Sequence, residues 1–380
     1  MKTPADFNFK NKTVLIRCDF NISFDEKGNV LDDLRVRESI PTIREVINGG
    51  GKAVLIGHTS EGKTLKDMIP LLEGLLKKKI EFISKTGQEM VTIVQEASWG
   101  DILLLENLRL FDGEEENSEH FANELAITAD FFINEAFSVC HRNHSSVVRL
   151  PDLLPHCAGF GLVQEIKVLS RVKDNPERPM VTIIGGAKVA SKIKVVEIFL
   201  EKSDSVLLGG KVANEILVIK GIIKDKPWPD EEVIKEIENL KLTSSKIHLP
   251  VDLVVDGEYS FRIVTPDTVK KEEEIYDIGP ETIKIFSKII SEARVIVWAG
   301  PLGFFEDKKY EKGTREIAQA IAMNRKAFKV IGGGDTGIAL TKFQLRDSID
   351  HISTGGGAML DFIAGEKLPG LKALGYYDEN

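Results

Sequence analysis

The sequence predicts an α/β protein with two doubly wound, Rossmann-like domains, each built on a parallel sheet. Short apolar runs rich in β-branched residues alternate with longer amphipathic runs, which is the pattern of successive strand–helix units. The chain of 380 residues is long enough for two domains that each bury a core. An amphipathic stretch at 163–173 ends before a segment with two prolines at 175–179, as expected of a connection between domains.

The expected strands fall into two sets, one in each half of the chain. In the first half they cover 13–17, 53–56, 81–83, 102–105 and 131–133, with helical patterns such as 40–48 and 71–79 between them. In the second half they include 180–184, 205–208, 251–255, 294–298 and 328–331. We therefore expect a first domain over 1–162, a connecting helix over 163–173, and a second domain that begins at 174.

Composition and charge argue against several classes of partner. The net charge of −9 argues against nucleic acid as the main partner. No apolar run reaches the roughly 18 residues of a spanning helix, and the N-terminus has no apolar signal core, so we expect no membrane partner. Three cysteines without CxxC spacing favour the reducing cytoplasm over a disulfide framework. Two charge runs, 114–116 and 270–274, are interpreted as solvated loops or faces.

Four glycine-rich turns in the second half predict a binding site for a polyphosphate. Each follows an apolar run, and together they comprise Gly185-Gly186, Gly209-Gly210, Gly332-Gly333-Gly334 and Gly355-Gly356-Gly357. Glycine lets a phosphate approach the backbone, and the first N–H groups of a following helix are unpaired and favour negative charge. Asp335, directly after the first triplet, offers a hard oxygen ligand for the Mg²⁺ that accompanies a polyphosphate.

The strand ends of the first half carry a different set of residues. They are Arg17, Asp19, Asn21, Arg35, His58, Arg109, His141 and Arg142. Ligands of open α/β sheets bind outside the carboxyl ends of the strands, so these residues are expected to gather there. Several arginines suit a multidentate cradle for carboxylate and phosphate. A metal cluster at Cys140-His141-x-x-His144 is not favoured, because no partners stand at zinc spacing.

These motifs resemble, in order and over nearly the whole chain, those of the phosphoglycerate kinase family. The first half contributes Val14 to Asn21, Leu104 to Arg109, Glu135-Ala136-Phe137 and His141 to Ser146. The second half contributes Gly185 to Lys192, Leu249 to Asp252, Val297 to Glu306 and both glycine triplets. The resemblance implies reversible phosphoryl transfer between ATP and the carboxylate of 3-phosphoglycerate, which gives ADP and 1,3-bisphosphoglycerate.

The resemblance also implies roles for single residues and for the domains. The first domain, completed by 365–380, would bind 3-phosphoglycerate through Asp19, Asn21, Arg35, His58, Arg109 and Arg142. The second domain, 174–364, would bind the nucleotide through Gly185, Gly186, Lys188, Lys192, Gly209, Gly210, Glu306, Gly332, Gly333, Gly334, Asp335 and Thr336. Asp335 would ligate Mg²⁺, and Arg35 and Lys192 would act on the transferring group. The 163–173 helix would be the hinge, and the family is generally monomeric.

Three positions depart from the family pattern. Where the family has an arginine after the second strand, this chain has His58-Thr59-Ser60-Glu61, which replaces a cation with a carboxylate. Ala299 stands in place of an asparagine near the transferring phosphates. Lys211 interrupts a glycine triplet. These departures leave a slow kinase, or one with altered specificity, as an alternative, and Lys63 is a candidate replacement for the missing cation.

Two alternatives stay open at this point. Gly57 to Thr64 satisfies the P-loop pattern between a strand and a helix, although the nearby strands end in residues unconvincing as its magnesium-holding acid. A P-loop NTPase would bind nucleotide there. The second alternative is a nucleotide-binding relative whose substrate site has decayed, for which Glu61 and Ala299 are the support.

Overall fold

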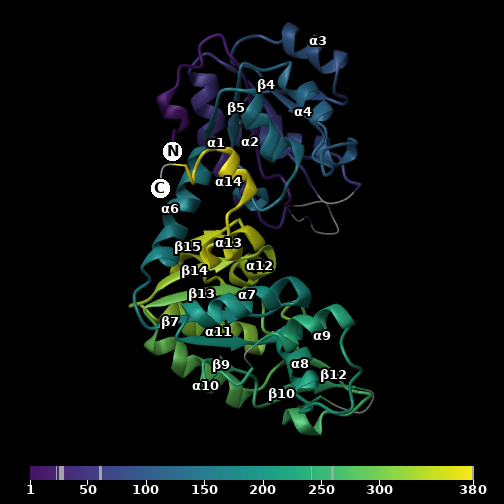
Figure 1. Ribbon diagram of the computed structural model, residues 1–380, viewed down its shortest axis with the longest axis vertical. Coiled ribbons are helices and arrows are strands. Elements are labelled where there is room, and N and C mark those ends of the chain that lie inside the picture. The colour runs from purple at the N-terminus through teal and green to yellow at the C-terminus, as the bar shows by residue number, and fades with distance from the viewer. Residues whose placement is uncertain (23, 25–29, 60–61, 241, 258–260, 379–380) are drawn as a thin grey trace. The chain divides into compact units, whose positions relative to one another are not determined.

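The computed structural model describes residues 1–22, 24, 30–59, 62–240, 242–257 and 261–378 (Figure 1). The chain divides into two compact units, one formed by 1–169 with 365–380 and the other by 170–364. Helix α6 (Phe160–Asp174) contains the expected connecting helix, and the division falls between its residues 169 and 170. Its role as a hinge stays a prediction. Within the described residues, no helix is both long and apolar enough to cross a membrane.

The first unit is built on a six-stranded parallel sheet with the strand order β3-β4-β2-β1-β5-β6. The strands are β1 (Thr13–Arg17), β2 (Lys52–Ile56), β3 (Ile80–Ile83), β4 (Ile102–Leu105), β5 (Phe131–Asn134) and β6 (His156–Ala158). The helices are α1 (Leu34–Asn48), α2 (Ile69–Leu76), α3 (Gln88–Glu96), α4 (Glu119–Ala126), α5 (Leu150–Leu153) and α14 (Pro369–Ala373). Val14 and Ile16 pack in one core and Leu15 in a second, so β1 is buried on both faces. Burial on both faces explains the continuous apolar runs of the sequence.

The second unit repeats this architecture with the strand order β15-β14-β13-β7-β8-β9, again all parallel. Its strands are β7 (Met180–Ile184), β8 (Ser205–Leu208), β9 (Ile247–His248), β13 (Val295–Ala299), β14 (Phe328–Gly332) and β15 (His351–Ser353). Its helices are α7 (Val189–Lys202), α8 (Gly210–Ile219), α9 (Glu231–Glu238), α10 (Pro280–Glu292), α11 (Lys312–Met323), α12 (Gly334–Lys342) and α13 (Gly357–Ala364). The predicted fold class, two α/β domains with parallel sheets, is confirmed.

One predicted strand belongs to a different sheet. The run 251–255 corresponds to β10 (Leu253–Asp256), which lies between β11 (Arg262–Val264) and β12 (Glu274–Ile278) in a three-stranded antiparallel sheet. Its assignment to the parallel pattern was therefore wrong. The cause is the packing of Leu253, Val255 and Val264 in a separate small core rather than in the core of the six-stranded sheet.

The beginning of α6 is tied to the first unit by a buried carboxyl group. Glu135, just after β5, accepts a hydrogen bond from the Thr42 Oγ1 at 2.7 Å and one from the backbone N–H of Gly161 at 2.5 Å. The Thr42 hydroxyl in turn accepts from the N–H of Phe160 at 3.0 Å. Glu135 and Thr42 thus accept hydrogen bonds from N–H groups of the first helical turn, which have no partner within the helix.

The C-terminal segment also lies in the first unit. The backbone N–H of Gly370 donates to the carbonyl of Cys140 at 2.8 Å, and α14 packs on the segment 145–149. A side chain at Gly370 would collide with Val147 and Cys140, which explains why glycine stands there.

Candidate functional site

Three loops of the second unit meet where β7, β8 and β13 end. Gly186 and Gly210 have φ values of +90° and +58°, which side chains rarely allow. A Cβ on Gly210 would lie 2.8 Å from the Gly186 nitrogen, and one on Gly185 would lie 2.1 Å from the carbonyl oxygen of Pro301. Only glycine permits this close approach of backbone to backbone.

A cavity of about 560 Å³ opens beside these loops. Gly186, Gly210, Glu306 and Asp335 line it, so the structure brings together four of the residues that the sequence assigned to a nucleotide. Its volume lies within the range of about 300–1,000 Å³ that is usual for small-molecule sites. The turn after β15, with the second glycine triplet, is not part of the lining.

Sequence reasoning missed much of the apolar and polar wall of this cavity. The residues that it did not assign include Glu215, Lys226, Trp228, Tyr276 and Phe304. Trp228 is 64% exposed and forms part of the accessible wall of the cavity. Exposure depends on the folded chain, so composition alone could not reveal it.

Lys192, on the first turn of α7, holds two of the three loops together. Its Nζ donates to the carbonyl oxygen of Gly185 and, at 3.1 Å, to that of Ala299. Burial lowers the pKa of Lys192 to about 8, against the opposing effect of Asp335 and with a smaller contribution from Lys188. Ala299, which stands where the family has an asparagine, therefore interacts with Lys192 through its backbone carbonyl oxygen.

The turn between β14 and α12 shows what each of its residues does. Gly332 lies under Met359, and Gly333 has a φ of +97° immediately before the helix. Asp335 is exposed in the first helical turn, next to Gly334, which has no atom near its missing Cβ. Thr336 is fully buried, and its Oγ1 accepts from the N–H of Gly300 at 2.8 Å. The hydroxyl of Thr336 therefore links this turn to the end of β13.

Three further residues of this side are placed as follows. Lys188 is exposed at the N-terminal end of α7, and Gly209 packs against Leu302 at the start of α8. Lys211, which interrupts the glycine triplet, forms an ion pair with Glu215 at 3.4 Å. The second carboxylate oxygen of Glu215 is buried without a hydrogen-bond partner among the described residues, and burial raises its pKa.

In the first unit, Asp19 is the centre of the predicted substrate cluster. It is 4% exposed and accepts from Arg35 at 2.9 Å, from the Ser138 hydroxyl at 2.5 Å and from the N–H of Asn21 at 3.1 Å. Burial would raise the pKa of Asp19, but Arg35, His58 and these hydrogen bonds outweigh it and hold the pKa below its ordinary value. Asp19 is therefore ionised and orients Arg35.

His58 is also buried, and it contacts Arg17 rather than solvent. The Arg17 Nη2 lies 3.1 Å from the His58 Nδ1. Burial lowers the pKa of His58 to about 3, with Arg17 and Arg109 as further causes. His58 is therefore an uncharged group near neutral pH.

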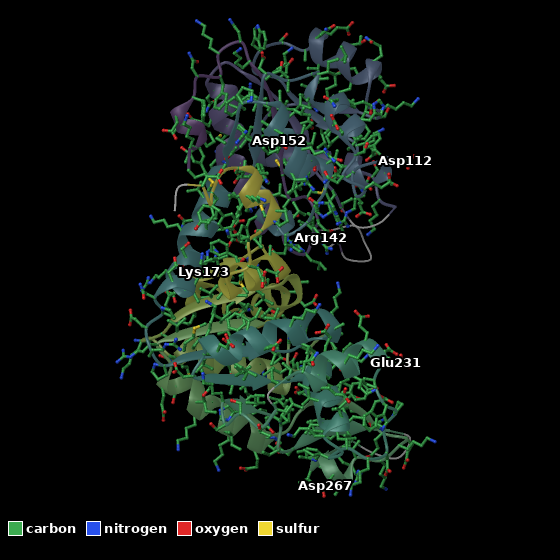
Figure 2. The ribbon with its side chains drawn as sticks, in the orientation of Figure 1. Asp112, Arg142, Asp152, Lys173, Glu231 and Asp267 are labelled. Carbon is green, nitrogen blue, oxygen red and sulfur yellow. The ribbon has the colours of Figure 1, made fainter. Side chains whose placement is uncertain are left out.

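The two remaining arginines of the predicted cluster differ in their surroundings. The Arg109 Nε lies 3.1 Å from the Glu115 carboxylate, but it makes no aligned hydrogen bond among the described residues. Arg142, labelled in Figure 2, is exposed. Its neighbour His141 has a buried Nδ1 without a partner among the described residues, and burial lowers the pKa of that ring to about 4.

The charge run 114–116 was interpreted as solvated, and for Glu114 this is wrong. Glu114 is 1% exposed and accepts from the Ser146 N–H at 3.0 Å and from the Ser146 hydroxyl at 2.6 Å. Its charge balances the fully buried Arg17. Glu115 and Glu116 are exposed, as expected.

The segment that matches the P-loop pattern has a different local structure. The Thr64 hydroxyl donates to Glu106 at 2.6 Å, and Asn107 donates to the carbonyl of Lys63 at 2.8 Å. A short 3₁₀ turn at Leu65–Met68 separates Thr64 from α2, whereas a P-loop leads directly into its helix. Ser60 and Glu61 lie outside the described residues.

A glycine-lined cavity with a carboxylate in one unit, and a cluster of cations around Asp19 in the other, are features expected of a phosphotransferase with two substrates. The sequence model of the phosphoglycerate kinase family matches residues 5–366. The chain therefore belongs to the phosphoglycerate kinase family, and the enzyme is a phosphotransferase with a carboxyl group as acceptor. The P-loop alternative is not favoured.

Individual relatives agree with this assignment. The chain is 39% identical to the phosphoglycerate kinase of Borreliella afzelii, over 98% of this chain and 99% of the relative. It is 37% identical to that of Thermomicrobium roseum over the same shares. The phosphoglycerate kinase structure from Pyrococcus horikoshii matches with a TM-score of 0.87 and 33% identity over 100% of both chains. The Coxiella burnetii structure matches with a TM-score of 0.80 and 33% identity over 99% of both chains.

Proposed function

We propose that this chain catalyses the reversible transfer of a phosphoryl group between ATP and 3-phosphoglycerate, which gives ADP and 1,3-bisphosphoglycerate, as a step of glycolysis and gluconeogenesis. The observation that carries the proposal is the family match over residues 5–366. It is supported by the cavity at which Gly186, Gly210, Glu306 and Asp335 meet.

The proposal assigns one substrate to each unit. The first domain, 1–162 with 365–380, binds 3-phosphoglycerate through the Asp19, Arg35 and His58 cluster together with Asn21, Arg109 and Arg142. The second domain, 174–364, binds the nucleotide, and the 163–173 helix serves as the hinge. Glu306 is the candidate for the ribose hydroxyls. The phosphate oxygens of the bound nucleotide would accept hydrogen bonds from the backbone N–H groups of the turns at 185–186, 209–210 and 332–334, with Lys188 and Thr336 beside them.

In this reaction a carboxylate oxygen of the substrate attacks the γ-phosphorus of ATP while the bond to the leaving ADP oxygen breaks. Little covalent chemistry falls to the protein, so positioning and charge neutralisation supply most of the catalysis. We assign this neutralisation to Arg35 and Lys192. Arg35 is held by the Asp19 carboxylate, and Lys192 by two backbone carbonyls, so both cations are preorganised.

The residues around Asp335 fit a nucleotide-bound Mg²⁺. Among the described residues, no group of three histidine, cysteine or acidic side chains could hold a metal by itself. Mg²⁺ in phosphate sites takes one or two carboxylates and completes its shell with phosphate oxygens and water. Asp335 is exposed to the cavity and offers one such carboxylate. When bound, the ion would neutralise charge on the phosphates.

The partners follow from the same proposal. Mg-ATP and 3-phosphoglycerate are the small-molecule partners, and the protein acts as a monomer in the cytoplasm. The net charge of −9 supports the absence of a nucleic-acid partner, and no membrane partner is proposed. The local arginines of the first unit supply the positive charge that an anionic substrate needs.

A coupled assay tests the proposal. The full-length protein is mixed with 3-phosphoglycerate and Mg-ATP, and formation of the acyl phosphate is followed by NADH oxidation in a coupling reaction. We expect turnover that requires both substrates. ATP hydrolysis without 3-phosphoglycerate would instead support a P-loop NTPase. Nucleotide binding without any turnover would support a relative with a decayed substrate site.

A further inference from the structure

A line of buried polar side chains connects His58 to the interior of the first unit. The Arg17 guanidinium places Nη2 3.1 Å from the His58 Nδ1 and Nε 2.9 Å from the Ser146 Oγ. The Ser146 Oγ lies 2.6 Å from Glu114. All four side chains are buried; Arg17 and Glu114 are each 1% exposed. Of the four, only His58 is among the residues proposed to contact the substrate.

The chemistry of Arg17 fixes the direction of every hydrogen bond in this line. A guanidinium has only N–H groups and cannot accept a hydrogen bond. It therefore donates to the His58 Nδ1, which must present a lone pair. It also donates to the Ser146 Oγ, whose own proton goes to Glu114. An uncharged imidazole has one N–H, so the proton of His58 must be on Nε2.

We propose that Arg17 is a positioning residue that holds His58 as the tautomer protonated on Nε2, while Ser146 and Glu114 hold the guanidinium in place. The inference rests on the proposed function, in which His58 contacts 3-phosphoglycerate. Among the described residues, none forms a hydrogen bond with the His58 Nε2. This N–H is thus the group that donates to an oxygen of the substrate.

The charged groups around His58 among the described residues act on its ring in opposite directions. Arg17, Arg35 and Arg109 disfavour a positively charged ring, whereas Asp19 favours one. Together with burial, the three arginines keep the ring uncharged near neutral pH. Glu114 favours the charged form of Arg17. His58 therefore contributes a directional hydrogen bond, whereas Arg35 contributes charge.

The first test uses the unmodified full-length protein. Histidine is labelled with ¹⁵N, the His58 ring signals are assigned by comparison with His58→Gln, and its ring spectra are recorded from about pH 5 to pH 9. We expect a proton on Nε2, none on Nδ1, and no titration in this range. A proton on Nδ1, or a titration near the ordinary pKa of 6.5, would overturn the proposal.

The second test removes the guanidinium with Arg17→Met. We expect the His58 ring to populate both tautomers, and the KM for 3-phosphoglycerate to rise about 10-fold with little change in the KM for ATP. Arg149→Met is the matched control, because Arg149 lies three residues after Ser146 and its side chain hydrogen-bonds to Asn117. It should leave the His58 spectrum and both KM values unchanged.

The outcomes separate cleanly. If Arg17→Met keeps the Nε2 proton and the original KM for 3-phosphoglycerate, Arg17 does not position His58. If this variant does not fold, the spectra of the unmodified protein still decide whether the inference holds. A protein without phosphoryl transfer would contradict the proposed function, whereas an active protein with an ordinary, titrating His58 would contradict only this inference.

Discussion

Lys192 shows how burial and charge oppose each other at a single residue. Its Nζ is held by the carbonyls of Gly185 and Ala299, so it lies at a fixed place while burial weakens its hold on the proton. A fixed cation that can still exchange its proton near neutral pH agrees with the role in phosphoryl transfer that we propose for Lys192.

Replacing Lys192 or Arg35 by alanine should lower kcat about 10²-fold, with a smaller change in nucleotide affinity. The reason is that each cation is assigned to charge that develops during transfer. Lys194→Ala is the control, because Lys194 lies on the same helix, is 69% exposed and pairs with Glu236. Steady-state kinetics with both substrates measure the effect. Unchanged kcat in both alanine variants would remove these residues from the mechanism.

The pH dependence of Lys192 follows from its lowered pKa. The side chain is charged below about pH 8 and loses its charge as the pH rises through this value. We therefore expect kcat/KM for ATP, which reports the free enzyme, to fall above about pH 8. Lys192→Arg should remove this fall, because arginine stays charged. A Lys192→Arg profile with the same alkaline limb would assign that limb to another group.

The limits of sequence reasoning at this scale are visible in the run 114–116. Three adjacent glutamates are most often solvated, and two of them are exposed. Glu114 is buried because Arg17, almost a hundred residues earlier, is buried beside it. Pairing over such a distance has no local signature, so neither the buried glutamate nor the buried arginine could be distinguished from the others.

At the scale of elements, the turn before α12 separates two effects of glycine. Gly333 has a φ of +97°, whereas Gly334 has open space around its missing Cβ and no positive φ. Gly333→Ala should therefore lower both Tm and the affinity for Mg-ATP. Gly334→Ala should lower the affinity for Mg-ATP but leave Tm nearly unchanged, because its new methyl group obstructs only an approaching phosphate. Calorimetry and nucleotide titration measure both, and an unaffected nucleotide affinity in both variants would exclude this turn from the site.

Most strands were predictable because their apolar runs are short, continuous and buried on both faces. The pairing of β10 was not, because a short apolar run such as 251–255 indicates a strand without indicating its partners. Its neighbours β11 and β12 are short and partly exposed, so they have little apolar signal of their own. The antiparallel sheet is therefore a product of tertiary packing in its own small core.

At the scale of the whole molecule, the two candidate nucleotide sites lie in different units and can be tested in the intact chain. Asp335→Asn should weaken the binding of Mg-ATP about 10-fold while leaving the KM for 3-phosphoglycerate nearly unchanged.

Lys63→Ala should raise the KM for 3-phosphoglycerate about 10-fold at low salt, if Lys63 replaces the family arginine, and should leave the KM for ATP unchanged. Loss of ATP binding in Lys63→Ala would revive the P-loop interpretation.

Fold class and family could be predicted because both depend on patterns repeated along the chain. The glycine turns stand at strand ends in the structure as they do in the sequence, since parallel strands bring their carboxyl ends to one edge. The walls of the cavity could not be predicted, because Trp228 and Tyr276 come from segments without a motif. The individual roles of the site residues stay predictions until kinetics test them.

The buried Glu135, whose carboxyl group contacts the start of α6, makes the stability of the fold depend on pH. Burial raises its pKa to about 8, although its hydrogen bonds oppose the rise. The group is therefore protonated in the folded chain at pH 6 and ionised in the unfolded chain, whose ordinary value is 4.5. Its contribution to stability is fully present below that ordinary value and is lost as the pH rises through about 8.

Unfolding near pH 6 should thus release about one proton from this carboxyl group into the buffer. The calorimetric enthalpy of unfolding should then depend on the ionisation enthalpy of the buffer, and differ between imidazole and phosphate at equal pH. Glu135→Gln should lower the number of protons released on unfolding, which is the slope of the unfolding enthalpy against the buffer's ionisation enthalpy, by about one. An equal dependence in the variant would mean that Glu135 keeps its ordinary acidity inside the fold.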